Sequence, residues 1–248
     1  MLTDVVVHDP ARHVADTGLA LVERAFDFAP GTLPSSRSEQ AAPDWRLPLP
    51  ERARAAAAAC LVSASHAGGA PPGPFLAVHV SAGRDVKQWP PERFADVAAA
   101  IARAHAMSVV LTGTAEDRPL VDRAIARLSV MGVDPMRVDG TTDVVMLAAV
   151  LQQARLLITA DTGPMHLAAA VGTPLVAVFG PSMPWRYGPL GRESRVVRID
   201  LPCSPCNRIR LPPVRCQGHV PDCLEGVTTT MVREAAEGLL AGAHAGAD

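Results

Sequence analysis

Two short polar segments hold the residues whose types and spacing could do chemistry. In the stretch LLITADTGPMHLAAAVGTPLVAVFGPS, residues 156–182, an apolar run leads into a polar turn, and Asp161 and Thr162 stand just before Pro164. Proline suits the first helical position, and Asp and Thr are good N-caps. The unpaired N–H groups and the dipole of such a helix start favour an anion, phosphate above all. Helix capping without any ligand is the alternative interpretation.

The second segment, SAGRDVKQWP at residues 81–90, follows the apolar run FLAVHV. Ser81 and Gly83 would allow a ligand to approach the backbone closely, and Lys87 could hold a phosphate as a point charge. The alternative is a solvated loop in which Arg84 and Lys87 are surface cations. Trp89-Pro90 is expected to pack the loop onto the next helix.

Hydrophobic periodicity predicts the elements that position these two segments. Strands are expected at residues 75–80, 108–111, 136–138, 156–158, 175–179 and 195–199, after a short one at 5–7. Helices are expected at residues 11–26, 51–62, 91–105, 116–129, 143–153, 165–171 and 228–240, with turns at 112–114 and 159–163. This alternation predicts an α/β fold, a doubly wound parallel sheet that binds ligands at the carboxyl ends of its strands.

The segment ASHAGGAPPGP, residues 64–74, has the composition of a linker. We therefore expect two units, residues 1–70 and residues 71–248, with the regular strand–helix alternation confined to the second. The first unit combines two helical patterns with a proline-rich loop at residues 30–50.

Composition excludes several classes of function. The 248 residues carry a net charge of −2, which gives no electrostatic case for nucleic-acid binding. The start, MLTDVVVHDPARH, lacks the pattern of a signal peptide, so a cytoplasmic location is expected. No G-x-G-x-x-G follows the strand at 75–80, which weighs against a dinucleotide-dependent dehydrogenase.

Four cysteines form a third group, Cys203-x2-Cys206-x9-Cys216-x6-Cys223. Two residues between thiolates let both reach one tetrahedral ion, so a zinc site is one interpretation. The second pair is spaced more loosely than in a zinc ribbon, and the segment is rich in proline. The alternative is a cluster of reduced thiols on an irregular loop, and we expect the purified protein to be largely free of zinc.

The two polar segments, with their flanking elements, resemble a known family. DTGPMHLAAAVGTPLVAVFGPS is similar to the donor-site signature of the family 9 glycosyltransferases, the lipopolysaccharide heptosyltransferases. AVHVSAGRDVKQWPPERFADVAAAI resembles the same family's strand, small polar loop, Lys and Trp-Pro followed by a helix. HVADTGLALVERAF resembles the helical stretch that links the two halves in that family.

This resemblance implies the GT-B fold, in which two Rossmann-like domains enclose a cleft. The C-terminal domain would bind a nucleotide-activated sugar, usually ADP-heptose, as a substrate, with no cofactor. The reaction would invert the anomeric centre without a metal. The acceptor would be a lipid-linked or lipopolysaccharide-core sugar, which implies a peripheral contact with the inner membrane.

The resemblance also implies roles for individual residues, with Lys87 and Asp161 as the catalytic pair. Asp161 would bond sugar hydroxyls, and Ser81, Gly83 and Lys87 would contact the donor diphosphate. Backbone N–H groups would come from Thr162, Gly163 and Met165. His166 would lie beside the phosphates, or alternatively face the core and bond a backbone carbonyl.

One feature departs from the family pattern. Family members begin with a strand and a Gly-Asp loop that supplies the general base, whereas no Gly-Asp dipeptide opens this chain. Residues 1–70 therefore read as a truncated N-terminal acceptor domain. We expect weak or no transfer by the 248-residue chain alone, and a non-catalytic nucleotide-sugar-binding module is the alternative function.

Overall fold

A computed structural model describes residues 9–26, 29, 46–65, 73–140, 142–191 and 193–245. Its centre is a six-stranded sheet in which every neighbouring pair is parallel, in the order β3-β2-β1-β4-β5-β6. The strands are β1 (Phe75–His79), β2 (Ser108–Gly113), β3 (Met136–Asp139), β4 (Leu156–Ala160), β5 (Leu175–Val178) and β6 (Ser194–Val197). The strand order reverses between β1 and β4, which is where doubly wound sheets bind ligands.

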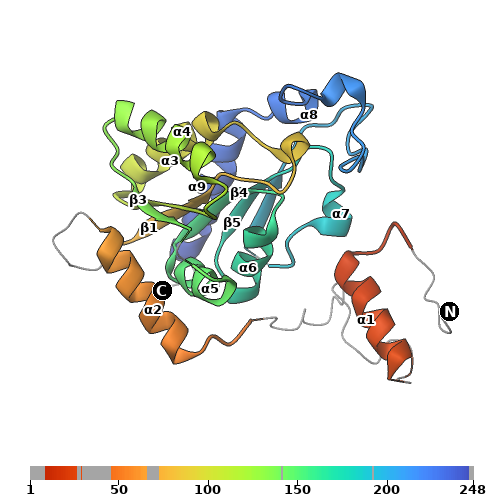
Figure 1. Ribbon diagram of the computed structural model, residues 1–248, viewed down its shortest axis with the longest axis horizontal. Coiled ribbons are helices and arrows are strands. Elements are labelled where there is room, and N and C mark those ends of the chain that lie inside the picture. Colours follow the sequence, from red (N-terminus) through yellow and green to blue (C-terminus); the bar gives the residue numbers. More distant parts are fainter. Residues whose placement is uncertain are drawn as a thin grey trace.

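Helices cover both faces of this sheet (Figure 1). One core joins it to α3 (Pro91–His105), α4 (Arg118–Val130) and α9 (Thr229–Ala245). The other joins it to α2 (Glu51–Ala64), α5 (Val144–Gln153) and α6 (Gly163–Val171). The predicted α/β class and Rossmann-like, doubly wound parallel sheet are confirmed, and α3 has the predicted bounds. Among the described helices, none combines the length and apolar character needed to cross a membrane.

Two strands extend further than their side chains suggested. Thr159 and Ala160, expected in a turn, continue β4, because they pair in register with Ala177 and Val178 of β5. Thr112 and Gly113 likewise continue β2 and pair with β3. The sequence prediction was wrong here because polar side chains at the end of a strand do not stop backbone pairing, and threonine favours strands.

The helix α2 belongs with the sheet, although it precedes the expected boundary at residue 70. Leu49, Ala53, Ala57 and Leu61 are buried in the same core as α5 and α6. Because this face supplies apolar contacts along the length of α2, the helix is part of the second unit by packing. Residues 66–72, the middle of the predicted linker, lie outside the described residues.

The N-terminal helix α1 (Val14–Ala25) is tied to the C-terminal unit through its first residues. His13 caps α1, since its Nδ1 accepts from the Ala15 N–H at 3.1 Å. Its Nε2 then donates to the Gly188 carbonyl at 3.0 Å. The Arg186 side chain, on the short helix α7 (Pro184–Tyr187), donates to the Asp9 carbonyl at 3.0 Å. The predicted strand 5–7 and most of the loop 30–50 lie outside the described residues.

Candidate functional site

The loop after β1 is held tightly and presents Lys87 from a short 3₁₀ turn, η1 (Asp85–Lys87). Gln88 closes the loop, because its Oε1 accepts from the Ala82 N–H at 2.9 Å. Trp89 is fully buried, and its Nε1 donates a hydrogen bond to the Val227 carbonyl. Its ring lies edge-on to that of Phe94 in α3, with 4.7 Å between the ring centroids. The packing role expected of Trp89 is thus confirmed, and it fixes the loop on which Lys87 lies.

Lys87 meets Asp161 at the end of β4. The Lys87 Nζ and Asp161 Oδ2 atoms are 3.0 Å apart, although the residues are separated by 74 positions in the chain. The side chains are only 17% and 9% exposed, so water screens this ion pair less than it would a surface pair. Lys87 is also the only lysine in the sequence; the other cations are arginines.

The start of α6 leaves backbone donors open next to this pair. Thr162 is the N-cap, and its side chain makes no capping hydrogen bond. In the described part of the chain, the N–H groups of Thr162 and Gly163 have no partner. The Met165 N–H, expected to face a ligand, bonds the Thr162 carbonyl at 3.2 Å instead, because the first turn is tightened there. The Met165 side chain is buried in the core.

Two glycines of the predicted site stand in open space. A Cβ atom added at Gly83 or Gly163 would meet no heavy atom within 4 Å. Neither residue has a backbone conformation that requires glycine. Neither packing nor backbone conformation therefore requires glycine at these two positions.

Ser81 makes its side-chain hydrogen bond inside the protein. It is buried, and its Oγ lies 2.9 Å from His79 Nε2. His79 Nδ1 lies 3.1 Å from Thr112 Oγ1. Burial lowers the pKa of His79 to about 4, although the charge of Asp117 opposes this. His79 was not singled out from the sequence; the signal was a histidine inside the apolar run FLAVHV.

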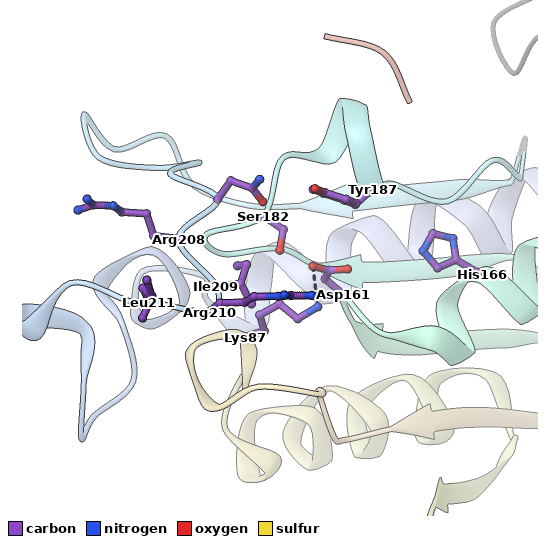
Figure 2. Close-up of a pocket in the computed structure, with 10 residues that line it drawn as sticks. Lys87, Asp161, His166, Ser182, Tyr187, Arg208, Ile209, Arg210 and Leu211 are labelled. Atoms are coloured by element: carbon purple, nitrogen blue, oxygen red, sulfur yellow. Dashed lines mark hydrogen bonds and ion pairs between the residues drawn. The ribbon is translucent and has the colours of Figure 1, made fainter. Parts of the chain in front are cut away.

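A cavity of about 560 Å³ opens at this edge of the sheet (Figure 2). It is lined by Lys87, Asp161, His166, Ser182, Tyr187 and the loop residues 207–211. The structure therefore brings together three of the predicted site residues, Lys87, Asp161 and His166. Ser81, Gly83, Thr162, Gly163 and Met165 do not line it.

Tyr187 and the loop 207–211 were missed by the sequence analysis. Tyr187 lines the cavity from the short helix α7. Burial raises its pKa, but hydrogen bonds with Asn207 and Arg186 outweigh this and lower it overall. The Asn207 N–H donates to the Pro181 carbonyl at 2.7 Å, and the residue adopts a left-handed conformation with φ 54°. The loop comes from an irregular segment, which periodicity cannot predict.

His166 lies on α6, away from the ion pair (Figure 2). It is exposed, so it does not face the core, contrary to the alternative considered from sequence. Partial desolvation lowers its pKa; the Asp161 charge opposes this, and the charges of His13 and Lys87 add to it. The imidazole is therefore neutral at pH 7, when it can both donate and accept one hydrogen bond.

The four cysteines line a second cavity, of about 250 Å³, beside the first. All four are free thiols. The described residues include no group of three or more His, Cys, Asp or Glu side chains arranged to hold a metal ion. Burial raises the pKa of Cys223 to about 11, although a hydrogen bond with Ser204 lowers it in part. Arg208 lines both cavities and so joins the two regions.

Comparison with known proteins gives consistent matches. The family model for glycosyltransferase family 9 (heptosyltransferase) matches residues 4–212. Lipopolysaccharide heptosyltransferase 2 of Salmonella typhimurium is 32% identical over 114 residues, which are 46% of this chain and 32% of that protein. A lipooligosaccharide heptosyltransferase 2 of Campylobacter jejuni is 29% identical over 64% of this chain and 48% of its own length. The matched region thus spans less than half of either relative.

A solved structure has the same fold. The family 9 glycosyltransferase of Veillonella parvula has a TM-score of 0.74 and 26% identity over 96% of this chain and 62% of that one. The sequence segments that carried the resemblance, the strand order and the Lys87–Asp161 edge all lie within the region matched by the family model. The chain therefore belongs to glycosyltransferase family 9, the heptosyltransferase family.

Proposed function

We propose that this chain binds a nucleoside-diphosphate sugar, ADP-heptose, and serves the transfer of its heptose to a lipopolysaccharide-core acceptor. The relatives named above are heptosyltransferases, and an Escherichia coli structure described as an ADP-heptose heptosyltransferase shares the fold, with a TM-score of 0.69 over 98% of this chain. The observation that carries the proposal is the ion pair of Lys87 and Asp161, which lies next to the open N–H groups of α6 and lines the cavity.

This arrangement suits a donor whose two ends differ chemically. The α6 start and Lys87 supply backbone donors and positive charge, which the diphosphate needs. Asp161 supplies carboxylate oxygens, which accept hydrogen bonds from sugar hydroxyls. The glycosidic carbon would lie where the two meet, so one edge of the sheet serves both parts of the donor.

The proposed reaction is a single inverting displacement. An acceptor hydroxyl attacks the anomeric carbon, the bond from that carbon to the phosphate oxygen breaks, and the nucleoside diphosphate leaves with the electron pair. A general base on the acceptor side of the cleft takes the hydroxyl proton. Lys87 and the α6 N–H groups stabilise the charge that develops on the leaving group, in place of a metal ion. Such preorganised donors supply a large part of many rate enhancements.

Donor binding is the first test. We expect isothermal titration of the 248-residue chain with ADP-heptose to detect binding, and Lys87→Ala and Asp161→Ala each to weaken it about 10- to 100-fold, the usual effect of losing a charged hydrogen bond. Arg195→Ala, an exposed arginine on β6, is the matched control and should bind as the parent does. If both site variants bind as well as the parent, the donor site lies elsewhere.

A second test uses the lone lysine. An amine-selective reagent can label only Lys87 and the chain's α-amino group. We expect ADP-heptose to protect Lys87 from labelling, as read by peptide mass spectrometry. Transfer to a heptose-free core acceptor separates the two function classes: the product of transfer identifies an enzyme, whereas binding without product identifies a binding module.

A further inference from the structure

The positive charge of the cavity exceeds what the predicted site residues supply. Its lining contains three cations, Lys87, Arg208 and Arg210, against one carboxylate, Asp161, whereas the whole chain carries a net charge of −2. His166 adds no charge at pH 7, since its pKa is lowered. The cavity lining is therefore net positive, although the chain as a whole is net negative.

Lys87 alone does not account for diphosphate binding. Its ammonium group is 3.0 Å from the Asp161 carboxylate, so the pair is close to neutral seen from a ligand. A nucleoside diphosphate brings at least two negative charges into this space. Beyond the N–H groups of the α6 start, a further cation would balance these charges while leaving the ion pair intact.

The loop 207–211 supplies that cation. Within the described residues, neither Arg208 nor Arg210 has a hydrogen-bond or ion-pair partner in the protein. Figure 2 shows the Arg210 side chain extending toward the Asp161–Lys87 pair, and that of Arg208 extending away from it. Arg210 thus adds a positive charge beside an ion pair that is close to neutral, and this charge would stabilise a bound anion.

The backbone of the loop is anchored on the side that precedes Arg210. Asn207 bonds the Pro181 carbonyl at 2.7 Å through its N–H, and Ser204 Oγ donates to the Gly180 carbonyl at 2.9 Å. Both acceptors follow β5, the strand beside β4. The anchored loop thereby places Arg210 in the lining of the cavity that also contains Lys87.

We propose that Arg210 is a binding residue for the sugar-proximal phosphate of the donor, contacting it from the side opposite α6 with its guanidinium fork. This deepens the proposed function and rests on it. Asp161 marks the sugar end of the donor, so the phosphate next to the sugar is the one that Arg210 reaches. A guanidinium suits this place because it can bind two phosphate oxygens at once.

The test compares two arginines of one loop. The parent chain, Arg210→Gln and Arg208→Gln are titrated with ADP at low salt, and their melting temperatures are recorded without ligand. We expect Arg210→Gln to weaken ADP binding at least fivefold and Arg208→Gln less than twofold, with unchanged melting temperatures. Arg210→Lys should recover only part of the loss, since it lacks the fork.

Each outcome decides one claim. If the parent does not bind ADP, the proposed function fails for this chain. If the parent binds and Arg210→Gln binds equally well, the role of Arg210 is wrong and the donor proposal stands. If both glutamine variants lose the same affinity, the loop acts only through its overall positive charge, which also overturns the specific contact.

Titration with AMP tests which phosphate Arg210 contacts. Arg210→Gln should change AMP affinity less than twofold, and an equal loss with AMP and ADP would contradict the assignment to the second phosphate.

Discussion

The cavity has two walls of different construction. The sheet wall, made of the β1 loop 81–90 and the β4–α6 turn, consists of short connections between buried regular elements. The cysteine wall is the segment 199–226, of which residues 207–211 line this cavity; it is irregular, and its helices are the short η2 (Val214–Cys216) and α8 (Asp222–Glu225). Packing of buried side chains therefore fixes the geometry of the Lys87–Asp161 pair in the sheet wall. In the cysteine wall, a few hydrogen bonds position the loop that carries the arginines.

The largest effect should come from the anchor of the sheet wall. Trp89→Ala removes a fully buried indole, its contact with Phe94 and its bond to the Val227 carbonyl. We expect the free energy of unfolding to fall by about 4 kcal/mol, measured by urea denaturation. Trp185→Ala, at a residue 45% exposed, is the control and should change stability by less than about 0.5 kcal/mol. A loss below about 1 kcal/mol for Trp89→Ala would show that the sheet wall is not rigidly anchored.

A pH-dependent effect should come next, from the last residue of β1, the strand that leads into the sheet wall. The pKa of His79 is lowered from 6.5 to about 4 by burial, so the folded state holds this imidazole neutral. Stability from this group is complete above pH 6.5 and is lost as the pH falls toward 4, because the unfolded chain takes up a proton that the folded chain refuses. The loss should be about 3 kcal/mol.

Unfolding free energies at pH 7.5 and pH 4 test this point. His79→Gln should flatten the decline by most of that amount relative to the parent. His219→Gln, an exposed histidine of the cysteine wall, should leave the decline unchanged. If the parent and His79→Gln decline in parallel, the His79 site is not held neutral.

Substitutions at Gly180 and Gly83 should separate an effect on folding from an effect on binding. A Cβ atom at Gly180 would lie 2.7 Å from Leu224 Cγ and 3.2 Å from Cys223 Sγ, so Gly180→Ala forces the cysteine wall outward. We expect a loss of about 2 kcal/mol in denaturant unfolding. Gly83→Ala meets nothing within 4 Å and should leave stability within about 0.5 kcal/mol while weakening ADP binding. The reverse pattern would mean that Gly83 serves the fold and not a ligand.

The smallest effect concerns thiol reactivity within the cysteine wall. Burial raises the pKa of Cys223 to about 11, and Cys203 is exposed. Because the thiolate is the reactive form, iodoacetamide at pH 8 should modify Cys223 at least about tenfold more slowly than Cys203. Peptide mass spectrometry over time measures both rates in one sample. Equal rates would mean that the cysteine wall opens readily, which would sharpen the contrast with the sheet wall.

Local pattern alone determined much of the sheet wall. Periodicity predicted α3 with its bounds, and the β4–α6–β5 unit with small errors at its ends. It placed the loops that carry Lys87 and Asp161 after buried strands, where open sheets expose their loops, and the resemblance to family 9 then assigned roles to these two residues. These features are local: apolar spacing, a proline at a helix start and a glycine after a helix end are each encoded within a few residues.

Tertiary structure alone decided which of those residues meet. Lys87 pairs with Asp161 because β1 lies beside β4, and strand order is not encoded in the spacing of either segment. The same holds for α2, whose alanines gave no sign of the core that they enter, and for His79, whose low pKa arises from burial among distant residues. Arg210 reaches the cavity through an aperiodic loop fixed by hydrogen bonds to the β5 end, a contact that depends on folded geometry and not on any pattern along the chain.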